Sequence, residues 1–520
     1  MSRQDLFAQL QASASFDVAV VGGGATGLGI ALDAALRGLR VVLLESHDFA
    51  KGTSSRATKL VHGGVRYLAQ GNVSLVREAL HERAVLLQNA PHLAQPLPFV
   101  MPSYRWWETA FYGIGLKLYD LLAGSSGLGR TEFLSRQELL KRLPQAQQHG
   151  LRGGVQYWDG QFDDARLAMA LARTAQQQGA LLINYCPVTA LKHEHQRVVG
   201  VVCKDQETDQ VFDVRASCVI NATGVWVDAL RDMDGAAIER QVKPMVAPSQ
   251  GVHLVVDREF LNGDHALLVP STADGRVLFA VPWLGKVILG TTDTPRHDLP
   301  REPLPFESEI EFILQESARY LQRAPSRADV RSVWVGLRPL VKPQDDGGEN
   351  TKGLSREHTV LISRSGLVTV TGGKWTTYRA MAEDVMSRCI KANLINASAD
   401  AGISQHCALV GAPAPDTPTV SITQAAGLHL YGSEQNVVAQ MQGAHHWLTP
   451  ELNEAMVRFA AQHEYARTVE DVLARRSRLL FLEARQAMGV APQVAQILKN
   501  ETLCDPKLEE FLQVASHYVL

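Results

Sequence analysis

The stretch DVAVVGGGATGLGIALDAALRGLRVVLLE, residues 17–45, decides the fold. It begins with a valine-rich apolar run that is typical of a buried strand. Gly22, Gly24 and Gly27 follow in G-x-G-x-x-G spacing and open an alanine- and leucine-rich helical segment, which Gly38 ends. A second apolar run and a terminal acid complete a βαβ pattern. This order of features predicts a dinucleotide-binding unit.

Each residue type in this pattern has a physical role. One glycine permits a tight turn, one lets the backbone approach a pyrophosphate, and one lets the helix pack closely on the strand. The N-terminus of the helix offers unpaired N–H groups to phosphate oxygens. Glu45 ends the second strand, residues 40–44, where its carboxylate can accept hydrogen bonds from ribose hydroxyls. A glycine-rich turn in an ordinary βαβ unit is the alternative.

Length and composition exclude several classes of protein. The 520 residues suffice for two or three domains, and 51 basic against 54 acidic residues give no sign of a nucleic-acid partner. No apolar stretch reaches the roughly 18 residues needed to span a bilayer, and residues 1–15 lack the apolar core of a secretory signal. The six cysteines are scattered, which favours reduced thiols, and no histidine or cysteine cluster indicates a metal site.

The remaining patterns predict an α/β fold with an α+β part. Valine-rich runs such as GVHLVVD and KVILGTTD indicate an antiparallel sheet, and amphipathic runs at 451–462 and 468–488 indicate helices. We expect three regions: a discontinuous Rossmann-like cofactor domain (15–90, 150–230 and 350–392), an antiparallel-sheet substrate or cap domain (91–149 and 231–349) and an all-α C-terminal domain (397–520).

Residues 104–123, YRWWETAFYGIGLKLYDLLA, concentrate aromatic side chains between charged ones. The segment reads as a helix with two interpretations. We favour a partly buried helix that covers a pocket; the alternative is an interfacial helix that dips into a membrane surface.

Further motifs resemble those of one protein family and occur in the same order along the chain. The chain closely resembles the FAD-dependent glycerol-3-phosphate dehydrogenases from about residue 16 to 490, through TSSRATKLVHGGVRYL (53–68), DDARL (163–167), NATGVWVD (221–228), PWLGKVILGTTD (282–293), GLRPL (336–340), GGKWTTYR (372–379) and EYARTVEDVLARRSR (464–478). A generic two-dinucleotide-domain flavoprotein would share the first glycine motif without this combination.

The resemblance implies an FAD enzyme that oxidises sn-glycerol 3-phosphate to dihydroxyacetone phosphate. Electrons would pass to a membrane quinone, and the protein would sit peripherally on the cytoplasmic, inner face of the cell membrane as a homodimer. The chain lacks EF-hand-like D-x-D-x-D-G loops, unlike the calcium-regulated mitochondrial form. It also lacks the long insertion of the related oxidases, which favours the quinone-linked dehydrogenase.

Glycine turns and small hydroxyl residues in the matched motifs are the expected FAD contacts, because they hydrogen-bond pyrophosphate and ribitol without crowding them. The expected contacts are Asp17, Gly22, Gly23, Gly24, Ala25, Thr26, Gly27, Glu45, Thr53, Ser54, Ser55, Lys59, His62, Gly63, Val188, Thr223, Gly224, Lys374, Thr376 and Thr377.

The substrate is a small dianion with a secondary alcohol, so its pocket needs cations. Arginine matches a phosphate bidentately, and the motif positions Arg66, Arg338 and Arg356 are the candidates, with the hydroxyl of Tyr67 beside them. Without the motif match each arginine would read as a solvated surface residue, and Tyr67 as a packing residue.

The reaction also needs positive charge near the reduced flavin and a proton acceptor. Lys374 in the GGK turn is the candidate for the first role, and an ordinary turn is its alternative. His253 is the first candidate for a base and a substrate contact, and His62 is the second. We therefore expect His253, Arg338 and Lys374 to be catalytic, and His253 and Lys374 also to contact the substrate.

Three other functions stay open at this point. A glycerol-3-phosphate oxidase would pass electrons to oxygen, and a flavin amine or hydroxy-acid oxidoreductase would share the fold. A non-catalytic FAD-holding sensor or scaffold would carry the same cofactor motifs.

Overall fold

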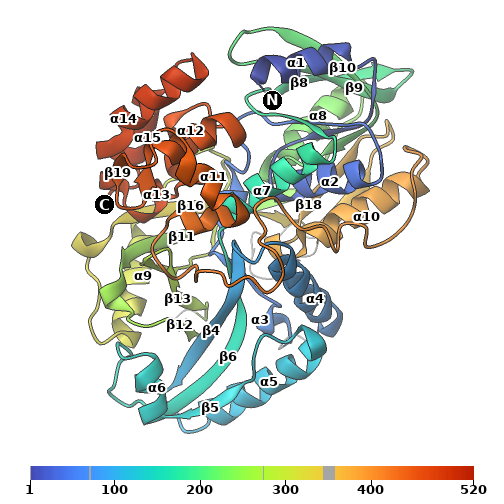
Figure 1. Cartoon of the computed structure of the whole chain (residues 1–520). Helices are drawn as coiled ribbons and strands as arrows, with labels where there is room; N and C mark the ends of the chain where they lie inside the picture. Colours follow the sequence, from blue (N-terminus) through green and yellow to red (C-terminus); the bar gives the residue numbers. More distant parts are fainter. Residues whose placement is uncertain (1, 69–71, 273–274, 343–357) are drawn as a thin grey trace.

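Two β-sheets and a helical C-terminal region make up the computed structural model, which describes residues 2–68, 72–272, 275–342 and 358–520. Figure 1 shows the helical region beside both sheets, with the first sheet and its helices above the second sheet in that view. The predicted combination of an α/β part, a largely antiparallel sheet and a helical C-terminal region is confirmed.

The first sheet is built outward from the opening glycine-rich unit. Its central strand pairs in parallel with a strand on each side, as the βαβ pattern predicts. In spatial order the strands are β17 (His358–Ile362), β18 (Val368–Gly372), β10 (Val211–Asn221), β1 (Phe16–Val21), β2 (Val41–Leu44) and β7 (Leu181–Ile183). The antiparallel pair β8 (Val188–Glu194) and β9 (Arg197–Lys204) extends from β10.

The helix α2 (Ala25–Leu36) packs against α7 (Asp164–Gln177) and α10 (Tyr378–Lys391). Two of its glycines make this packing possible. A Cβ on Gly27 would lie 1.9 Å from the carbonyl oxygen of Gly22, and a Cβ on Gly29 would lie 2.9 Å from the ring of Tyr378. The third glycine of the motif therefore serves helix–strand contact, as its spacing predicts.

The second sheet is antiparallel except where β12 pairs with β4. Its order is β15 (Thr294–Pro295), β11 (Val246–Asp257), β14 (Lys286–Gly290), β13 (Leu278–Trp283), β12 (Ala266–Val269), β4 (Ala94–Ser103), β6 (Gly153–Phe162) and β3 (Leu60–Val61), with β16 (Ser332–Val341) on β11 and β5 (Glu132–Ser135) on β6. β3 and β6 pair with each other in the second sheet, although they lie in the segments 15–90 and 150–230 that we assigned to the cofactor domain. β3 follows the loop after β2 of the first sheet, and β6 leads into α7 and then β7 of the first sheet, so the chain passes between the two sheets at both strands.

Helices flank both sheets. Asn72 caps α4 (Val73–Asn89), because its side-chain oxygen accepts a hydrogen bond from the backbone N–H of Leu75. The described helices outside the C-terminal region are α1 (Arg3–Ala12), α3 (Val65–Leu68), α4 (Val73–Asn89), α5 (Glu108–Ala123), α6 (Arg136–Arg142), α8 (Val227–Ala237) and α9 (Glu307–Tyr320), besides α2, α7 and α10. None of the helices in the described ranges is both long and apolar enough to cross a bilayer.

The C-terminal region is mainly helical. Its elements are α11 (Gln435–Gln440), β19 (Trp447–Thr449), β20 (Leu452–Asn453), α12 (Glu454–His463), the π-helical turn η9 (Asp471–Arg476), α13 (Leu479–Leu482), α14 (Ala484–Thr502) and α15 (Leu508–Ser516). The amphipathic run 468–488 is helical as expected but divided between η9, α13 and the start of α14, with a break at Arg478, which adopts φ 65°.

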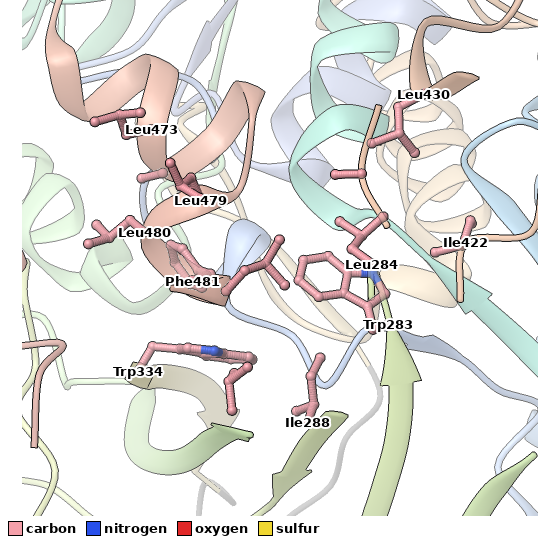
Figure 2. Close-up of a cluster of buried hydrophobic side chains, with 14 of the residues drawn as sticks. Trp283, Leu284, Ile288, Trp334, Ile422, Leu430, Leu473, Leu479, Leu480 and Phe481 are labelled. Carbon is pink, nitrogen blue, oxygen red and sulfur yellow. The ribbon is translucent and has the colours of Figure 1, made fainter. Parts of the chain in front are cut away.

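An apolar cluster joins the C-terminal region to the second sheet. Figure 2 shows Trp283 and Trp334, from β13 and β16, facing Leu479, Leu480 and Phe481 of α13. All five side chains are buried, and the ring of Trp334 lies 5.3 Å from that of Phe481. The helical region therefore shares a hydrophobic core with the sheet that it covers.

Candidate active site

A cleft opens at the carboxyl end of β1, where parallel sheets of this type bind ligands. The sequence stretches that line it come from seven parts of the chain. They contribute Val21, Gly22, Gly24, Ala25 and Thr26; Leu44, Glu45, Ser46, His47, Ala50, Lys51, Gly52, Thr53 and Ser54; Pro187 and Val188; Ala222 to Trp226, Ala229, Leu230 and Met233; Arg301 and Pro339; and Val370 to Trp375.

Ser54 holds two of these stretches to each other. Its hydroxyl accepts a hydrogen bond from the N–H of Ala25 at 2.9 Å, and its carbonyl accepts one from the indole N–H of Trp375 at 2.8 Å. The neighbouring hydroxyl of Thr53 donates to the carbonyl of Leu337 at 2.6 Å. The glycine-rich turn, the TSS segment, the GGKW turn and β16 therefore meet at one place, although up to 350 residues separate them in the chain.

Glu45 accepts hydrogen bonds from the backbone on both sides of the cleft rim. Its carboxylate receives the N–H of Gly23 at 2.6 Å and the N–H of His47 at 2.8 Å. Burial and the nearby positive charges of Lys51 and Arg301 lower the pKa of His47 to about 4, so its ring is neutral at pH 7. The acid that ends β2 thus fixes the loop that begins there.

Arg301 and Trp226 are cleft residues that sequence reasoning missed. The guanidinium of Arg301 lies 3.8 Å from the centre of the Trp226 ring, a cation–π distance, and the indole N–H of Trp226 donates to the carbonyl of Leu299 at 3.1 Å. Trp226 stood inside the NATGVWVD motif, so a signal for it existed. Arg301 lies in a proline-containing loop outside every motif, and nothing in the sequence distinguished it.

The GGK turn brings Lys374 to the cleft. Gly372 and Gly373 adopt φ values of 83° and 74°, which favour glycine, and a Cβ on Gly373 would lie 2.4 Å from the sulfur of Met381. Lys374 caps the short helix η7 (Trp375–Thr377), which leads directly into α10. The turn therefore presents both a cation and the N-terminal end of a helix to the cleft.

Arg338 lies on β16, next to the cleft residue Pro339. Its guanidinium donates to the hydroxyl of Thr291 at 3.2 Å and to the carbonyl of Thr292 at 3.0 Å, and it is 3.3 Å from the carboxylate of Asp293. Gly251 on the facing strand makes the space, since a Cβ there would lie 2.2 Å from this guanidinium. The side chain keeps about a quarter of its surface exposed. A fixed, partly exposed cation thus lies beside the cleft.

His253 lies deeper than its predicted role suggests. The side chain on β11 is buried, its ring stacks on Trp334 at 4.0 Å, and its Nε2 is 2.9 Å from the hydroxyl oxygen of Thr58. Burial, with the nearby charges of Arg338 and Lys59, holds the pKa of His253 well below its ordinary value. The ring is neutral at pH 7 and does not line the cleft.

Comparison with known proteins assigns this architecture. Residues 17–379 match the family described as FAD dependent oxidoreductase, and residues 405–507 match the C-terminal domain of alpha-glycerophosphate oxidase. The chain is 41% identical to the mitochondrial glycerol-3-phosphate dehydrogenase of Rattus norvegicus, over 100% of this chain and 75% of that protein. It is 39% identical to the mitochondrial glycerol-3-phosphate dehydrogenase SDP6 of Arabidopsis thaliana, over 98% and 86%.

The chain belongs to the FAD-dependent glycerol-3-phosphate dehydrogenase family. A solved structure of the glycerol-3-phosphate dehydrogenase from Bacillus halodurans complexed with FAD superposes with a TM-score of 0.77 at 27% identity, covering 100% of this chain and 98% of that one. The L-alpha-glycerophosphate oxidase from Mycoplasma pneumoniae shares the fold, with a TM-score of 0.55 at 17% identity. The resemblance inferred from the sequence motifs is confirmed.

FAD is the cofactor of this glycerol-3-phosphate dehydrogenase family member, and the cleft fits it. Gly24 caps α2, and Gly24, Ala25 and Thr26 at this end of the helix line the cleft, so the positive helix end faces it. Gly22 has φ 109°, and a Cβ there would lie 2.6 Å from the carbonyl oxygen of Ala222, which keeps the ends of β1 and β10 together. Backbone amides for phosphates and the carboxylate of Glu45 are the groups that a dinucleotide needs.

The predicted FAD contacts divide into two groups by position. Those on the cleft are Gly22, Gly24, Ala25, Thr26, Glu45, Thr53, Ser54, Val188, Thr223, Gly224 and Lys374. Those not among its lining residues are Asp17, Gly23, Gly27, Ser55, Lys59, His62, Gly63, Thr376 and Thr377. Most residues of the second group either are next in the chain to a lining residue or lie between packed elements.

Lys59 and Asp17 differ most from their predicted places. The ammonium of Lys59 is fully buried, 2.7 Å from the carboxylate of Asp164 and 4.6 Å from the Trp334 ring centre, and burial lowers its pKa to about 7. Asp17 starts β1 at the far end from the cleft and pairs with Arg40 at 2.8 Å. Both side chains have structural partners in place of a cofactor.

Three predicted substrate residues cannot be placed by their side chains. Arg66 and Tyr67 belong to α3, but their side chains lie outside the described part of the structure, as does Arg356. Within the described ranges, no group of three metal-ligating side chains occurs and all six cysteines are free thiols.

Proposed function

We propose that this chain oxidises sn-glycerol 3-phosphate to dihydroxyacetone phosphate and passes the electrons to a membrane quinone. The choice of substrate rests on the whole-chain similarity to enzymes named glycerol-3-phosphate dehydrogenase. The geometry supports it, because Lys374 lines the FAD cleft and Arg338 lies on β16 next to the cleft residue Pro339. A phosphate dianion is the substrate group that such cations recognise.

FAD, when bound, accepts a hydride from the alcohol carbon. The protein supplies the charges around that transfer. Arg338 binds the substrate phosphate by exchanging part of its contact with Asp293, and Lys374 with the helix end at η7 stabilises the negative charge that develops in the cleft. These roles for Arg338 and Lys374 are the ones that the motifs predict.

The proton of the substrate hydroxyl needs an acceptor near these cations. His253 is neutral at pH 7 and its Nδ1 has no hydrogen-bond partner among the described residues, so the ring can accept a proton. Its lowered pKa makes it a weak base, and its burial means that substrate would reach it only through neighbouring groups such as the hydroxyl of Thr58. His62 stays the second candidate.

Anaerobic reduction tests the reaction directly. The purified holoenzyme, mixed without oxygen with sn-glycerol 3-phosphate, should lose the oxidised-flavin absorbance near ~450 nm. Glycerol and glycerol 2-phosphate serve as controls that lack the phosphate or the correct alcohol. If the flavin stays oxidised with sn-glycerol 3-phosphate, the enzyme proposal is wrong and a sensor or scaffold is left.

A glycerol-3-phosphate oxidase is the second candidate function. The C-terminal match to alpha-glycerophosphate oxidase favours it. Turnover in air without a quinone decides between the two. One hydrogen peroxide per dihydroxyacetone phosphate identifies the oxidase, whereas turnover that requires an added short-chain quinone identifies the dehydrogenase.

The helix α5 supports membrane contact. Its apolar side chains recur at helical spacing on the exposed face, with exposed fractions of 65% at Phe111, 69% at Ile114 and 76% at Leu121, and Trp106 just before the helix is 81% exposed. α5 contributes no residue to the cleft, so the interpretation that it covers this pocket is not supported. Figure 1 shows α5 along the edge of the second sheet that is farthest from the first. We propose that this face rests on a membrane.

Vesicle sedimentation tests this surface. Phe111→Glu with Leu121→Glu should abolish binding to phospholipid vesicles while leaving turnover with a soluble electron acceptor unchanged. Val211→Glu, which changes an exposed apolar side chain on β10, is a matched control. Retained binding in the α5 variant would refute the assignment. The cytoplasmic-side location and the homodimer belong to the same proposal, and cell fractionation and light scattering test them.

A further inference from the structure

The turn between α12 and α13 inserts charged side chains behind the FAD cleft. Its sequence from residue 470 to 478, EDVLARRSR, carries two acids and three arginines, and Arg475, Arg476 and Arg478 are each no more than 2% exposed. Charged groups are buried only with partners, so the partners show what this turn is for.

Asp48 is the first partner. It lies in the loop after β2, between the cleft residues His47 and Ala50, and its carboxylate is fully buried. It accepts hydrogen bonds from the guanidiniums of both Arg475 and Arg476, including one from Arg476 at 2.9 Å. Burial alone would raise the pKa of Asp48, but the two guanidiniums hold it below its ordinary value.

Two further contacts bind the same loop. The ammonium of Lys51, a cleft residue, lies 2.6 Å from the carboxylate of Glu470. The guanidinium of Arg478 donates to the carbonyl of Ser55 at 2.8 Å. The loop 46–55 is therefore held at its start, middle and end by one turn of the C-terminal region.

The turn and the loop form one connected set of charges, which we name the buried ion cluster. Inside the C-terminal turn, Arg475 also contacts Glu470 at 2.7 Å and Asp471 at 2.8 Å. The cluster comprises Asp48, Glu470, Asp471, Lys51, Arg475 and Arg476, and Lys51 also lies 3.6 Å from the carboxylate of Glu302. Removing one member leaves its partners buried without compensation, which makes the set cooperative.

The other face of the loop lines the cleft. His47, Ala50, Lys51 and Thr53 border the space that FAD occupies, and the N–H of Ala50 donates to the carbonyl of Gly23 in the glycine-rich turn at 2.9 Å. One side of the loop therefore touches the cofactor site while the other touches the C-terminal turn. Any change in how the turn holds the loop changes the shape of the cofactor site.

We propose that the C-terminal helical region is part of the cofactor site, and that Asp48 and Glu470 are positioning residues through which it holds the loop 46–55 in its FAD-binding form. FAD binding and seating of the C-terminal turn then stabilise each other, because two events that favour the same conformation are coupled reciprocally. The inference concerns FAD retention and does not depend on which substrate or electron acceptor the enzyme uses.

The structure supplies a matched control inside the same interface. Glu434 also belongs to the C-terminal region, and its carboxylate pairs at 2.6 Å with the guanidinium of Arg173 on α7. Among the described residues, neither side chain contacts the loop 46–55 or the turn 470–478. Glu434→Gln therefore weakens the domain contact without disturbing the loop.

Titration of full-length apoprotein with FAD, followed by flavin fluorescence, measures the coupling. Asp48→Asn should raise the Kd for FAD by roughly tenfold or more, within the usual range of couplings between sites. Glu470→Gln should raise it less, since its side chain is partly exposed. Glu434→Gln should lower the Tm slightly but keep the Kd for FAD within about twofold of the parent value.

Hydrogen exchange supplies the reciprocal readout in the parent chain. Adding FAD should slow amide exchange in residues 470–478 and leave α14 unchanged. Unaltered Kd values for both Asp48→Asn and Glu470→Gln would overturn the proposal, and so would an equal rise in Glu434→Gln. If Asp48→Asn fails to fold, the Glu470→Gln variant and the exchange experiment test the proposal without it. A parent-like Kd for FAD in Glu470→Gln, or amide exchange in 470–478 that does not change when FAD is added, would overturn the proposal.

Discussion

The two sides of the cleft are built from different chemistry. On the side of the first sheet, the cofactor meets backbone: the glycine-rich turn, the end of β10 and the N-terminus of α2. On the side of the second sheet, the groups beside the cleft are charged side chains, above all Arg338 with its neighbour Asp293. Backbone groups keep their place and charge whatever the pH, whereas side chains can exchange partners when a ligand arrives.

This difference predicts opposite sensitivities. The cofactor side should not tolerate an added Cβ, because space close to the backbone is what it offers, and it should respond to a change of charge only where the buried ion cluster holds the loop 46–55. The substrate side should tolerate small steric changes but not the loss of a cation. The four variants that follow are ordered from the largest expected effect to the smallest.

Gly24→Val should have the largest effect. A Cβ at this N-cap would lie 3.0 Å from the hydroxyl of Ser54, and the two methyl groups beyond it would enter the cleft at the helix end. Overpacking of this kind costs roughly 1–3 kcal/mol or more, so the Kd for FAD should rise by up to ~100-fold or beyond. Gly489→Val, in open space on α14, is the matched control and should bind FAD normally. Flavin content after purification measures both.

Arg338→Ala should impair substrate binding and spare the cofactor. The lost charge-assisted hydrogen bonds are worth roughly 1.5–3 kcal/mol, so the KM for sn-glycerol 3-phosphate should rise by about 10- to 100-fold. Arg331→Ala, which removes a cation paired with Asp257 just before the same strand, should leave KM unchanged. Flavin loss in the Arg338 variant would show that the two sides are not separable.

His47 is an exception on the cofactor side, because it is a side chain whose charge changes with pH. The variant His47→Gln tests its contribution to stability. The folded-state pKa of His47, about 4, lies below its ordinary value of 6.5, so between these values the unfolded chain binds more protons. Stability therefore falls as the pH drops from 6.5 to 4, by up to about 3 kcal/mol at roughly 1.4 kcal/mol per pKa unit. His47→Gln should lose less over this window. Denaturant unfolding at several pH values, with equal FAD, measures the difference, and identical slopes would contradict the assignment.

The sequence was informative where local pattern decides structure. β1, α2 and β2 lie where the first motif puts them, and its glycines Gly22 and Gly24 line the cleft. The buried ion cluster could not be predicted. Asp48 and Arg475 are 427 residues apart, and an isolated charged residue reads as a solvated one until its tertiary partners are known.

The same limit explains the misplaced contacts. Lys59 stands in a cofactor motif, yet Asp164 and the rings of Trp283 and Trp334, all distant in the chain, surround it. The break at Arg478 has the same origin, because the arginines of that turn are held by residues of the first sheet's loop. Local amphipathic pattern carries no information about such partners.

Asp17→Asn should have the smallest effect and sharpens the comparison from the other direction. Its motif position predicts a cofactor contact, but the carboxylate pairs with Arg40 at 2.8 Å, with about 61% of the arginine side chain exposed. Exposed pairs of this kind contribute less than about 1 kcal/mol, so stability should change little and the Kd for FAD not at all. Arg40→Gln should behave the same way. A higher Kd for FAD in Asp17→Asn but not in Arg40→Gln would show that the Asp17 carboxylate affects FAD binding from the opposite end of β1. The backbone at the cleft would then depend on side-chain charge more than its hydrogen bonds indicate.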